Sequence, residues 1–317
     1  MNPAVSILIP VYRSERYIEK CLQSVLTQTY HNLEVIIIDD ATPDNSMAIV
    51  DKITAQYPRN GMRIVHHESN KGIAATRNEL LKLASGEYLF FVDSDDYIAQ
   101  DAIESLVSIA TQANADLVRC NYIALKNNTE TAVSIPSFKD KEQLLKRHIA
   151  AWDSIEAMWQ LFIRRSLITD NHISFAKGIN ASEDHLMMIK LYLFARIIVD
   201  APKPVYYYRI DNELSVTHIN PKAFHDSMYK GMDDAINFLK KNGVYDTYRD
   251  EVLTRTFLTK QTFLLSKENR DIDLYLDTHP ECNSYYRKFN YSKKQRTLFK
   301  LAESGHRRLL KLIASLL

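Results

Sequence analysis

Short apolar runs rich in β-branched residues alternate with amphipathic stretches of helical period along roughly the first 120 residues. This alternation is typical of βαβ units and predicts an α/β fold with a mainly parallel sheet flanked by helices. Helices are predicted between the strands, over Glu15 to Thr27, Asn45 to Gln56, Ile73 to Ala84 and Asp101 to Ala113. The predicted strands themselves are Val5 to Ile9, Glu34 to Ile38, Arg63 to His66, Tyr88 to Val92 and Asp116 to Asn121.

The pattern changes in the rest of the chain. After Pro221 it is almost wholly helical, and Lys, Arg and Tyr become more frequent. We therefore predict two regions, an α/β domain over residues 1–217 and a helical C-terminal region over residues 218–317 with a basic amphipathic end. Between Asn127 and Pro221 the expected helices are Glu142 to Ile149, Ser154 to Ile163 and Ser182 to Phe194, and the expected strands are Ile197 to Val199 and Val205 to Tyr208.

Composition narrows the class of protein. The 317 residues are 46% hydrophobic and 25% charged, as in an ordinary globular protein, and a formal net charge of +1 argues against a nucleic-acid partner. The three cysteines are far apart and form no metal-binding or disulfide pattern. With no visible secretory signal and no apolar stretch long enough to span a bilayer, we expect a cytoplasmic protein.

Carboxylates follow the fourth predicted strand, which is apolar on both faces. Asp93, Asp95 and Asp96 lie within four residues, with Ser94 between the first two. Ligands of open α/β sheets bind outside the carboxyl ends of the strands, and hard oxygen ligands suit Mg²⁺ or Mn²⁺. Asp95 is the predicted metal ligand, and Asp93 is a second ligand or a ribose contact. The alternative is an acidic turn that caps the helix starting near Asp101.

The first two strands bring further candidates to the same edge. Asp39 and Asp40 follow the second strand, and an ionised Asp40 can accept a hydrogen bond from the ring N–H of uracil. The first strand ends in Ile9-Pro10-Val11-Tyr12, where the ring of Tyr12 can stack on a base. The alternative is that Tyr12 only packs against the first helix.

A basic helix start and a late acidic pair complete the set. The run from Asn70 through Gly72 to Arg77 offers free N–H groups and a fork of donors suited to a phosphate or a base carbonyl. Glu183 and Asp184 open a later helix, where acids are favoured by the helix dipole and simple capping is the alternative. In the functional interpretation Asp184 is the general base that removes a proton from an attacking hydroxyl.

Together these runs resemble the family 2 glycosyltransferases, which have the GT-A fold, over about residues 4 to 217. Ala41-Thr42-Pro43 departs from the Gly-Ser-Thr more usual after the paired acids, which bears on the shape of that loop. The matching motifs are the first strand through Tyr12, Ser24-Val25-Leu26-Thr27-Gln28-Thr29-Tyr30, Glu34 to Asp40, Asn70-Lys71-Gly72 with Arg77-Asn78, Gly86-Glu87-Tyr88, Asp93-Ser94-Asp95-Asp96 and Glu183-Asp184.

The resemblance implies a role for each of these positions. Asp95 would bind Mn²⁺ or Mg²⁺, and Asp184 would be the base of an inverting transfer from a UDP-sugar to a glycan or lipid-linked saccharide. Trp159 would be an acceptor contact or a core residue, and Arg209, Ser215 and His218 would touch the diphosphate or complete the metal shell. The predicted nucleotide site comprises Pro10, Val11, Tyr12, Asp39, Asp40, Asn70, Gly72, Arg77, Asp93 and Ser94.

Two other functions remain open from the sequence alone. A nucleotidyl- or phosphotransferase would use the same carboxylates and metal, but no G-x-x-x-x-G-K-[ST] loop or G-x-G-x-x-G turn is present. A non-catalytic nucleotide-sugar binding module would have no need of a base such as Asp184.

The C-terminal end combines apolar and basic positions at helical spacing. Such a helix either lies on anionic lipid at the inner face of the membrane, which would suit a lipid-linked acceptor, or docks on its own domain or a second subunit. The apolar positions are Leu298, Ala302, Leu309, Leu312, Ile313 and Leu316, and the basic ones are Lys300, Arg307, Arg308 and Lys311.

Overall fold

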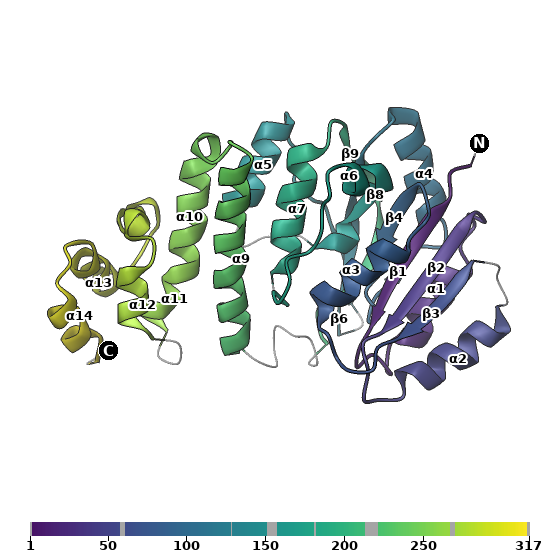
Figure 1. Ribbon diagram of the computed structural model, residues 1–317, viewed down its shortest axis with the longest axis horizontal. Coiled ribbons are helices and arrows are strands. Elements are labelled where there is room, and N and C mark those ends of the chain that lie inside the picture. Colours follow the sequence, from purple (N-terminus) through teal and green to yellow (C-terminus); the bar gives the residue numbers. More distant parts are fainter. Residues whose placement is uncertain are drawn as a thin grey trace. The chain divides into compact units, whose positions relative to one another are not determined.

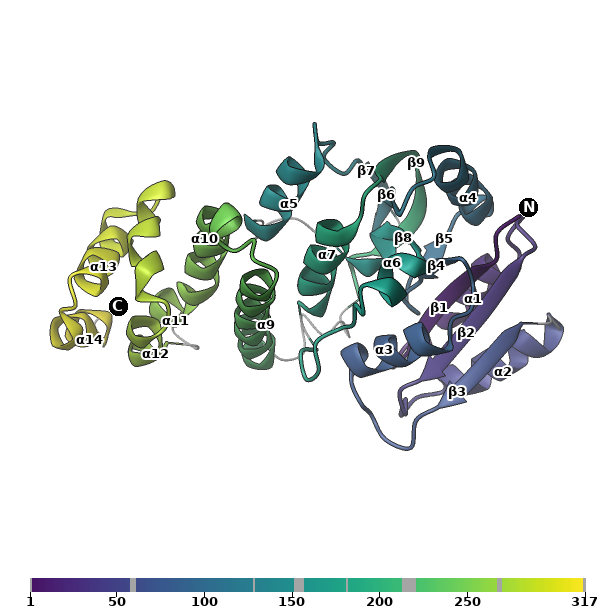
Figure 2. The same ribbon diagram turned by 45° about the horizontal axis from the view of Figure 1, so that its top comes forward.

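The computed structural model describes residues 2–57, 61–127, 129–150, 157–180, 182–212, 221–266 and 270–315, with side chains except at 221–225 and 315. These residues fall into two compact units, one within 1–141 and 156–219 and the other within 142–155 and 220–317. The sequence prediction had kept 142–155 in the first region. We describe each unit by itself (Figures 1 and 2).

The first unit is built on a mixed sheet. Its described strands run in the order β3-β2-β1-β4-β8-β6-β9-β5, with β7 paired to β6. The strands β3, β2, β1 and β4 are parallel, as predicted, and β9 is parallel to β6. The strand bounds are β1 Val5–Val11, β2 Leu33–Asp39, β3 Met62–His66, β4 Tyr88–Phe91, β5 Tyr97–Ile98, β6 Leu117–Lys126, β7 Thr129–Val133, β8 Leu161–Arg164 and β9 Ile198–Arg209.

The parallel strands are apolar because helices cover both faces of the sheet. All seven residues of β1 are buried, as expected of a central parallel strand. Side chains of α1, α2 and α4 share one core with one face of β1 and β2, while α3 packs against the same two strands from the other face (Figure 2). The helices are α1 Ile18–Leu26, α2 Ser46–Gln56, α3 Ile73–Leu83, α4 Ala102–Ala113, α6 Arg165–Asp170 and α7 Glu183–Phe194.

One predicted helix is wrong. In place of a helix over Ser154 to Ile163, the structure has a 3₁₀ turn at Met158–Gln160 followed by strand β8. Residues 154–156 lie outside the described part. The strand pairs antiparallel with β4 on one edge and β6 on the other. Its first three residues are also buried. Its short apolar run is equally compatible with a buried helix, which is why periodicity alone misassigned it.

The reversed strand has a consequence for the site. Because β8 is antiparallel to β4, its beginning lies beside the carboxyl end of β4, where the Asp93 to Asp96 segment starts. The predicted strands at Ile197 to Val199 and Val205 to Tyr208 belong to one continuous strand, β9, which also reaches this edge and pairs with β5. Residues from both halves of the unit therefore meet at one edge of the sheet.

The second unit is helical in its described part, as predicted for the region after Pro221. Its main core consists of buried side chains from the helices after residue 252, among them Phe257, Tyr275 and Phe299. The helices are α5 Lys141–Ala150, α9 Pro221–Lys241, α10 Arg249–Lys260, α11 Thr262–Leu265, α12 Ile272–Asp277, α13 Lys293–Glu303 and α14 Arg307–Ser315, with 3₁₀ segments at Asp246–Tyr248 and Pro280–Lys288.

The basic C-terminal helix docks within its own unit. Leu310 and Ala314 of α14 are buried in the core just described, whereas Leu309 and Leu312 are 43% and 60% exposed. Arg307 forms ion pairs with two aspartates of α12, and Lys311 pairs with one of them. Docking on its own domain, one of the two alternatives left open by the sequence, accounts for this half of the helix. Among the described residues, no helix is long and apolar enough to cross a membrane.

Candidate active site

A single buried guanidinium gathers three acids from two separate segments. Arg77 lies on α3, is 3% exposed, and donates to Glu183 Oε1 at 2.8 Å and to Asp93 Oδ1 at 3.1 Å. It also forms a hydrogen bond and ion pair with Asp184. The fork geometry of arginine allows one side chain to hold several carboxylates at once. The structure thus brings together three of the predicted site segments, which are 16 to 107 positions apart in sequence.

The predicted base lies at the first turn of α7. Asp184 Oδ1 faces Arg77, and its Oδ2 accepts a hydrogen bond from the backbone N–H of Met158 at 3.3 Å. Burial raises the pKa of Asp184 above its ordinary value, while the positive charge of Arg77 opposes that rise. Burial, followed by the charge of Asp184, also raises the pKa of Glu183. A carboxylate with a raised pKa is a stronger proton acceptor, as a general base requires.

The carboxylates of the acidic segment after β4 differ in whether protein groups already occupy their oxygens. Asp96 is 1% exposed and fully engaged: Oδ2 accepts from the hydroxyl of Tyr206 at 2.9 Å, and Oδ1 accepts from Arg209 N at 2.7 Å. The same Tyr206 hydroxyl accepts a hydrogen bond from Asp93 N at 3.0 Å. Asp95 Oδ2 accepts from Asn212 at 2.8 Å. Asp96 therefore shapes the segment, and Asp93 and Asp95 remain as its candidate ligands.

The chemistry of this segment fits a divalent cation. Burial and the charge of Asp93 raise the pKa of Asp95, and burial and the charge of Asp95 raise that of Asp96 even further. Crowded carboxylates that raise one another's pKa are stabilised by a cation, and Mg²⁺ or Mn²⁺ needs only one or two of them besides water and phosphate oxygens. Within the described ranges, no group of three or more His, Cys, Asp or Glu side chains forms a ready-made metal cage. The predicted ligand His218, like Ser215, lies outside those ranges.

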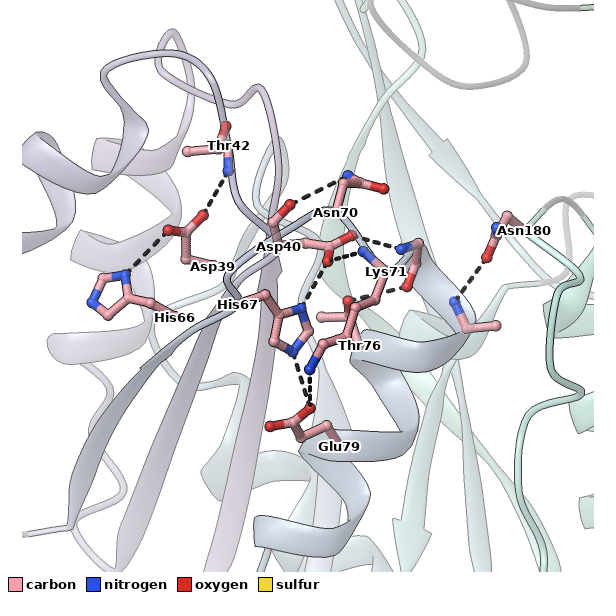
Figure 3. Close-up of polar contacts among 12 residues, drawn as sticks. Asp39, Asp40, Thr42, His66, His67, Asn70, Lys71, Thr76, Glu79 and Asn180 are labelled. Carbon is pink, nitrogen blue, oxygen red and sulfur yellow. Dashed lines mark hydrogen bonds and ion pairs between the residues drawn. The ribbon is translucent and has the colours of Figure 1, made fainter.

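The two acids after β2 hold loops in place (Figure 3). Asp39 accepts from Thr42 N at 2.8 Å and pairs with His66 at 3.1 Å. Asp40 is 4% exposed, and its two oxygens accept backbone N–H groups of the segment that leads into α3. The same carboxylate also contacts a histidine ring, described further below. Its predicted contact with uracil stays a prediction.

The end of β1 offers an aromatic surface. Pro10 and Val11 are buried in the strand, whereas Tyr12 is 41% exposed and is one of the few large hydrophobic side chains so exposed in the described residues. The ring lies 5.3 Å from the guanidinium carbon of Arg13. Stacking on a nucleotide base requires such an exposed ring. Nearby Ala41 adopts a left-handed backbone with φ 54°, a conformation that favours the glycine more usual at this position in the family.

The entrance to α3 depends on a glycine. Gly72 has φ 84°, and a Cβ at this position would lie 2.5 Å from the side chain of Asn180. Asn180 Oδ1 in turn accepts from Ala74 N at 3.4 Å, in the first turn of α3. Asn70 donates from its side chain to the carbonyl of Asp40 at 3.3 Å. Contacts with Asp40 and Asn180 therefore fix the segment that leads into α3. Ser94, another residue of the predicted nucleotide site, is also buried.

Trp159 is a core residue. It is 1% exposed and stacks on Tyr206 and Tyr208 at centroid distances of 4.4 and 5.0 Å. Of the two interpretations of Trp159, the structure favours the buried one over direct contact with an acceptor. Because Trp159 follows Met158 and packs on Tyr206, this cluster braces both the candidate base and the acidic segment. Sequence reasoning missed Tyr206, although its place in an alternating strand beside the acids was visible.

Comparison with known proteins identifies the family. Residues 6–169 match the family model described as Glycosyl transferase family 2. EpsH of Bacillus subtilis (strain 168) is 31% identical over 277 residues, which cover 84% of this chain and 78% of EpsH. The chain therefore belongs to glycosyl transferase family 2 and is an enzyme that transfers glycosyl groups.

Solved structures show the same fold. A crystal structure of TarS residues 1–349 from S. aureus in complex with UDP-GlcNAc has a TM-score of 0.69 at 21% identity, covering 98% of this chain and 90% of that one. The mannosyltransferase PcManGT from Pyrobaculum calidifontis, in complex with GDP-Man and Mn²⁺, has a TM-score of 0.52 at 16% identity, covering 100% and 87%. These matches confirm the predicted GT-A class of α/β fold with a helical C-terminal region.

In sequence, TarS of Staphylococcus aureus (strain Mu50 / ATCC 700699), a poly(ribitol-phosphate) beta-N-acetylglucosaminyltransferase, is 28% identical over 266 residues. The alignment covers 81% of this chain and 45% of TarS, so the chain spans less than half of that relative.

Proposed function

We propose that this glycosyltransferase moves a hexose from a UDP-sugar to a hydroxyl of a glycan or lipid-linked saccharide, by a single metal-assisted displacement with inversion. The observation that carries the proposal is the cluster around Arg77, in which the candidate base Asp184 and the first acid of the Asp93 to Asp95 motif contact the same guanidinium. Proton removal and departure of the nucleotide are thereby assigned to neighbouring groups at one edge of the sheet.

We assign each step of the transfer to a residue of this chain. Asp184 takes the proton of the acceptor hydroxyl as its oxygen attacks the anomeric carbon, and the bond from that carbon to the diphosphate breaks in the same step. No covalent intermediate is needed, because the attacking hydroxyl enters opposite the leaving group. Arg77 holds Asp184 in place. Asp93 and Asp95 would hold Mn²⁺ or Mg²⁺, which would neutralise the negative charge that develops on the departing diphosphate.

The donor nucleotide is assigned to the ends of β1 and β2. Asp40 would accept the ring N–H of uracil, and the exposed ring of Tyr12 would stack on the base. The TarS structure with UDP-GlcNAc supports a UDP-sugar donor, since that protein shares the fold. Cytosine has no N–H at the equivalent ring nitrogen, so a carboxylate reader distinguishes the two bases. Binding of CDP as tight as that of UDP would overturn the assignment of Asp40.

The catalytic assignment is tested by following UDP release from a panel of UDP-sugars with Mn²⁺, with and without EDTA. We expect release to require the metal, and Asp184→Asn to lower the rate at least about 100-fold because the base is removed. The exposed aspartate Asp51 on α2 provides the control variant Asp51→Asn, which should keep the wild-type rate. Metal-independent release would remove the role of Asp95, and a wild-type rate in Asp184→Asn would remove that of the base.

Peripheral contact with a membrane is the weaker part of the predicted function, because Arg307 and Lys311 are already paired with acids of α12. We assign any such contact to Leu309 and Leu312, which remain exposed beside Arg308. The double variant Leu309→Ser with Leu312→Ser should abolish flotation with anionic liposomes. Truncation is a poor test, because it would also remove the buried Leu310. Equal flotation of the variant and the wild type would exclude this contact.

A further inference from the structure

A buried histidine links the candidate nucleotide site to helix α3 (Figure 3). His67 follows the last residue of β3, and its side chain is 1% exposed. Its Nδ1 lies 2.8 Å from Asp40 Oδ1, and its Nε2 lies 3.0 Å from Glu79 Oε2 on α3. The proposed mechanism does not use this residue, and the sequence analysis did not single it out. Both ring nitrogens nevertheless face carboxylate oxygens, one of which belongs to the candidate base reader.

The two partners of His67 are both carboxylates. Asp40 Oδ1 and Oδ2 also accept the backbone N–H groups of Lys71 at 2.8 Å and Gly72 at 2.9 Å. Burial raises the pKa of Glu79, but hydrogen bonds from His67 and Lys71 outweigh it and keep that pKa below its ordinary value. The ring therefore bridges the acid after β2 and an acid of α3, one at each nitrogen.

The charged groups around the ring come from three elements. Asp40 lies at the end of β2, Glu79 lies within α3, and Lys71 in the segment before α3 places its Nζ 3.4 Å from Glu79 Oε2. The ring contacts the same Asp40 oxygen, Oδ1, that accepts the backbone N–H of Lys71, and so holds this carboxylate together with the Lys71 and Gly72 backbone. Without the ring, the carboxylate would lose a side-chain partner and turn from its present orientation.

We propose that His67 is a positioning residue for the donor nucleotide: it orients Asp40 toward the base, so that loss of the ring lowers affinity for uridine nucleotides. This inference rests on the proposed function, specifically on the assignment of Asp40 to uracil. It predicts an effect on the KM for the donor and on the Kd for UDP, with little effect on kcat at saturating donor. A residue that only stabilised the fold would not make that distinction.

The test is isothermal titration calorimetry of UDP and CDP at one pH, with wild type, His67→Gln and Glu79→Gln. We expect His67→Gln to bind UDP about tenfold or more weakly than wild type and to lose the preference for UDP over CDP. His31→Gln, at an exposed histidine of the same unit, is the matched control and should bind both nucleotides as wild type does.

Glu79→Gln keeps the test decisive if His67→Gln does not fold. Glu79 is 34% exposed on its side chain, and its replacement leaves the contact between His67 and Asp40 intact. With a neutral amide in place of the carboxylate, the ring is held less firmly from α3, and UDP affinity should fall by less than in His67→Gln. Wild-type UDP binding in Glu79→Gln, or in a folded His67→Gln, would overturn the inference.

Failure of the inference is distinguishable from failure of the proposed function. If wild type discriminates UDP from CDP but His67→Gln behaves as the control does, Asp40 reads the base without help from His67. If wild type binds CDP as tightly as UDP, the assignment of Asp40 fails and the inference fails with it. A preference for UDP over CDP that depends on His67 supports both.

Discussion

Replacement of Arg77 by methionine is the sharpest test of the site. The side chain is 3% exposed and faces Asp93, Glu183 and Asp184. Methionine preserves much of the volume but leaves three acids without their shared cation. Removing one partner of a buried ion pair lowers the free energy of unfolding by about 3–5 kcal/mol. Loss of the contacts between the guanidinium and two aromatic rings lowers it by a further amount of about 0.5–1 kcal/mol. We therefore expect the free energy of unfolding to fall by about 4 kcal/mol at pH 8.

The pH dependence of this loss is as informative as its size. Burial already raises the pKa values of Glu183 and Asp184 in the folded state, and loss of the opposing charge of Arg77 raises them further above their values in the unfolded chain. The folded variant then binds more protons than the unfolded one, so its stability increases as pH falls. Each unit of raised pKa returns about 1.4 kcal/mol once the carboxyl is protonated. The difference between wild type and Arg77→Met should accordingly shrink between pH 8 and pH 5.

Urea unfolding followed by circular dichroism measures both effects. With a denaturant slope of about 2 kcal/mol per molar, the expected shift of the midpoint is about 2 M at pH 8. Arg77→Lys keeps the charge but loses the fork of donors, so its urea midpoint should lie between those of wild type and Arg77→Met. Arg196, whose side chain is 87% exposed, supplies the control Arg196→Met, which should lie within about 0.5 kcal/mol of wild type. A midpoint of Arg77→Met equal to that of the control, or a difference independent of pH, would refute the role given to this guanidinium.

Three further substitutions test individual contacts. The folded-state pKa of Glu183 is raised, so its protonated carboxyl stabilises the fold below the ordinary pKa, and this stabilisation is lost as pH rises through the raised pKa. Glutamine mimics the protonated carboxyl at every pH. Glu183→Gln should therefore gain stability relative to wild type between pH 5 and pH 8, as measured by urea midpoints. Tyr206→Phe removes a donor from a buried carboxylate, and should cost about 1–3 kcal/mol and raise the Mn²⁺ concentration needed for half-maximal UDP release; unchanged values would contradict its bracing role. Gly72→Ala should destabilise by more than about 1 kcal/mol, and adding Asn180→Ala should recover only the steric part, since the left-handed backbone remains; full recovery would show that φ is unimportant.

The first part of the fold was predictable because parallel strands covered on both faces read as continuous apolar runs. β1 and β2 stand out for this reason, as do the carboxylates that follow β2 and β4. Strand β8 was not predictable, since its four residues Leu161–Arg164 carry no period of their own and their pairing with β4 and β6 is a tertiary property.

The site was predictable as a set of residues, but not as a set of contacts. Sequence reasoning placed Arg77 on phosphate or base because its fork of donors lies near a helix start, at the same sheet edge as the predicted acids. The structure instead shows its guanidinium among acids, two of which lie more than 100 positions later in the chain. Whether it also touches the nucleotide stays a prediction. The roles of Tyr206 and His67 depend on burial and on partners from other strands, which no local pattern reports.

Three successive tyrosines in β9 define the register of this strand poorly, and Asp96 defines it instead. Tyr206 and Tyr208 stack on Trp159, while Tyr207 stacks on Tyr97 on the opposite side of the strand. A slip by one position would present a tyrosine to each side again, so side-chain identity alone distinguishes the two alignments poorly. The carboxylate of Asp96 binds the backbone N–H of Arg209 and the phenol of Tyr206 together, which only one alignment allows. A buried acid inside the predicted metal-binding motif thus fixes the alignment of β9.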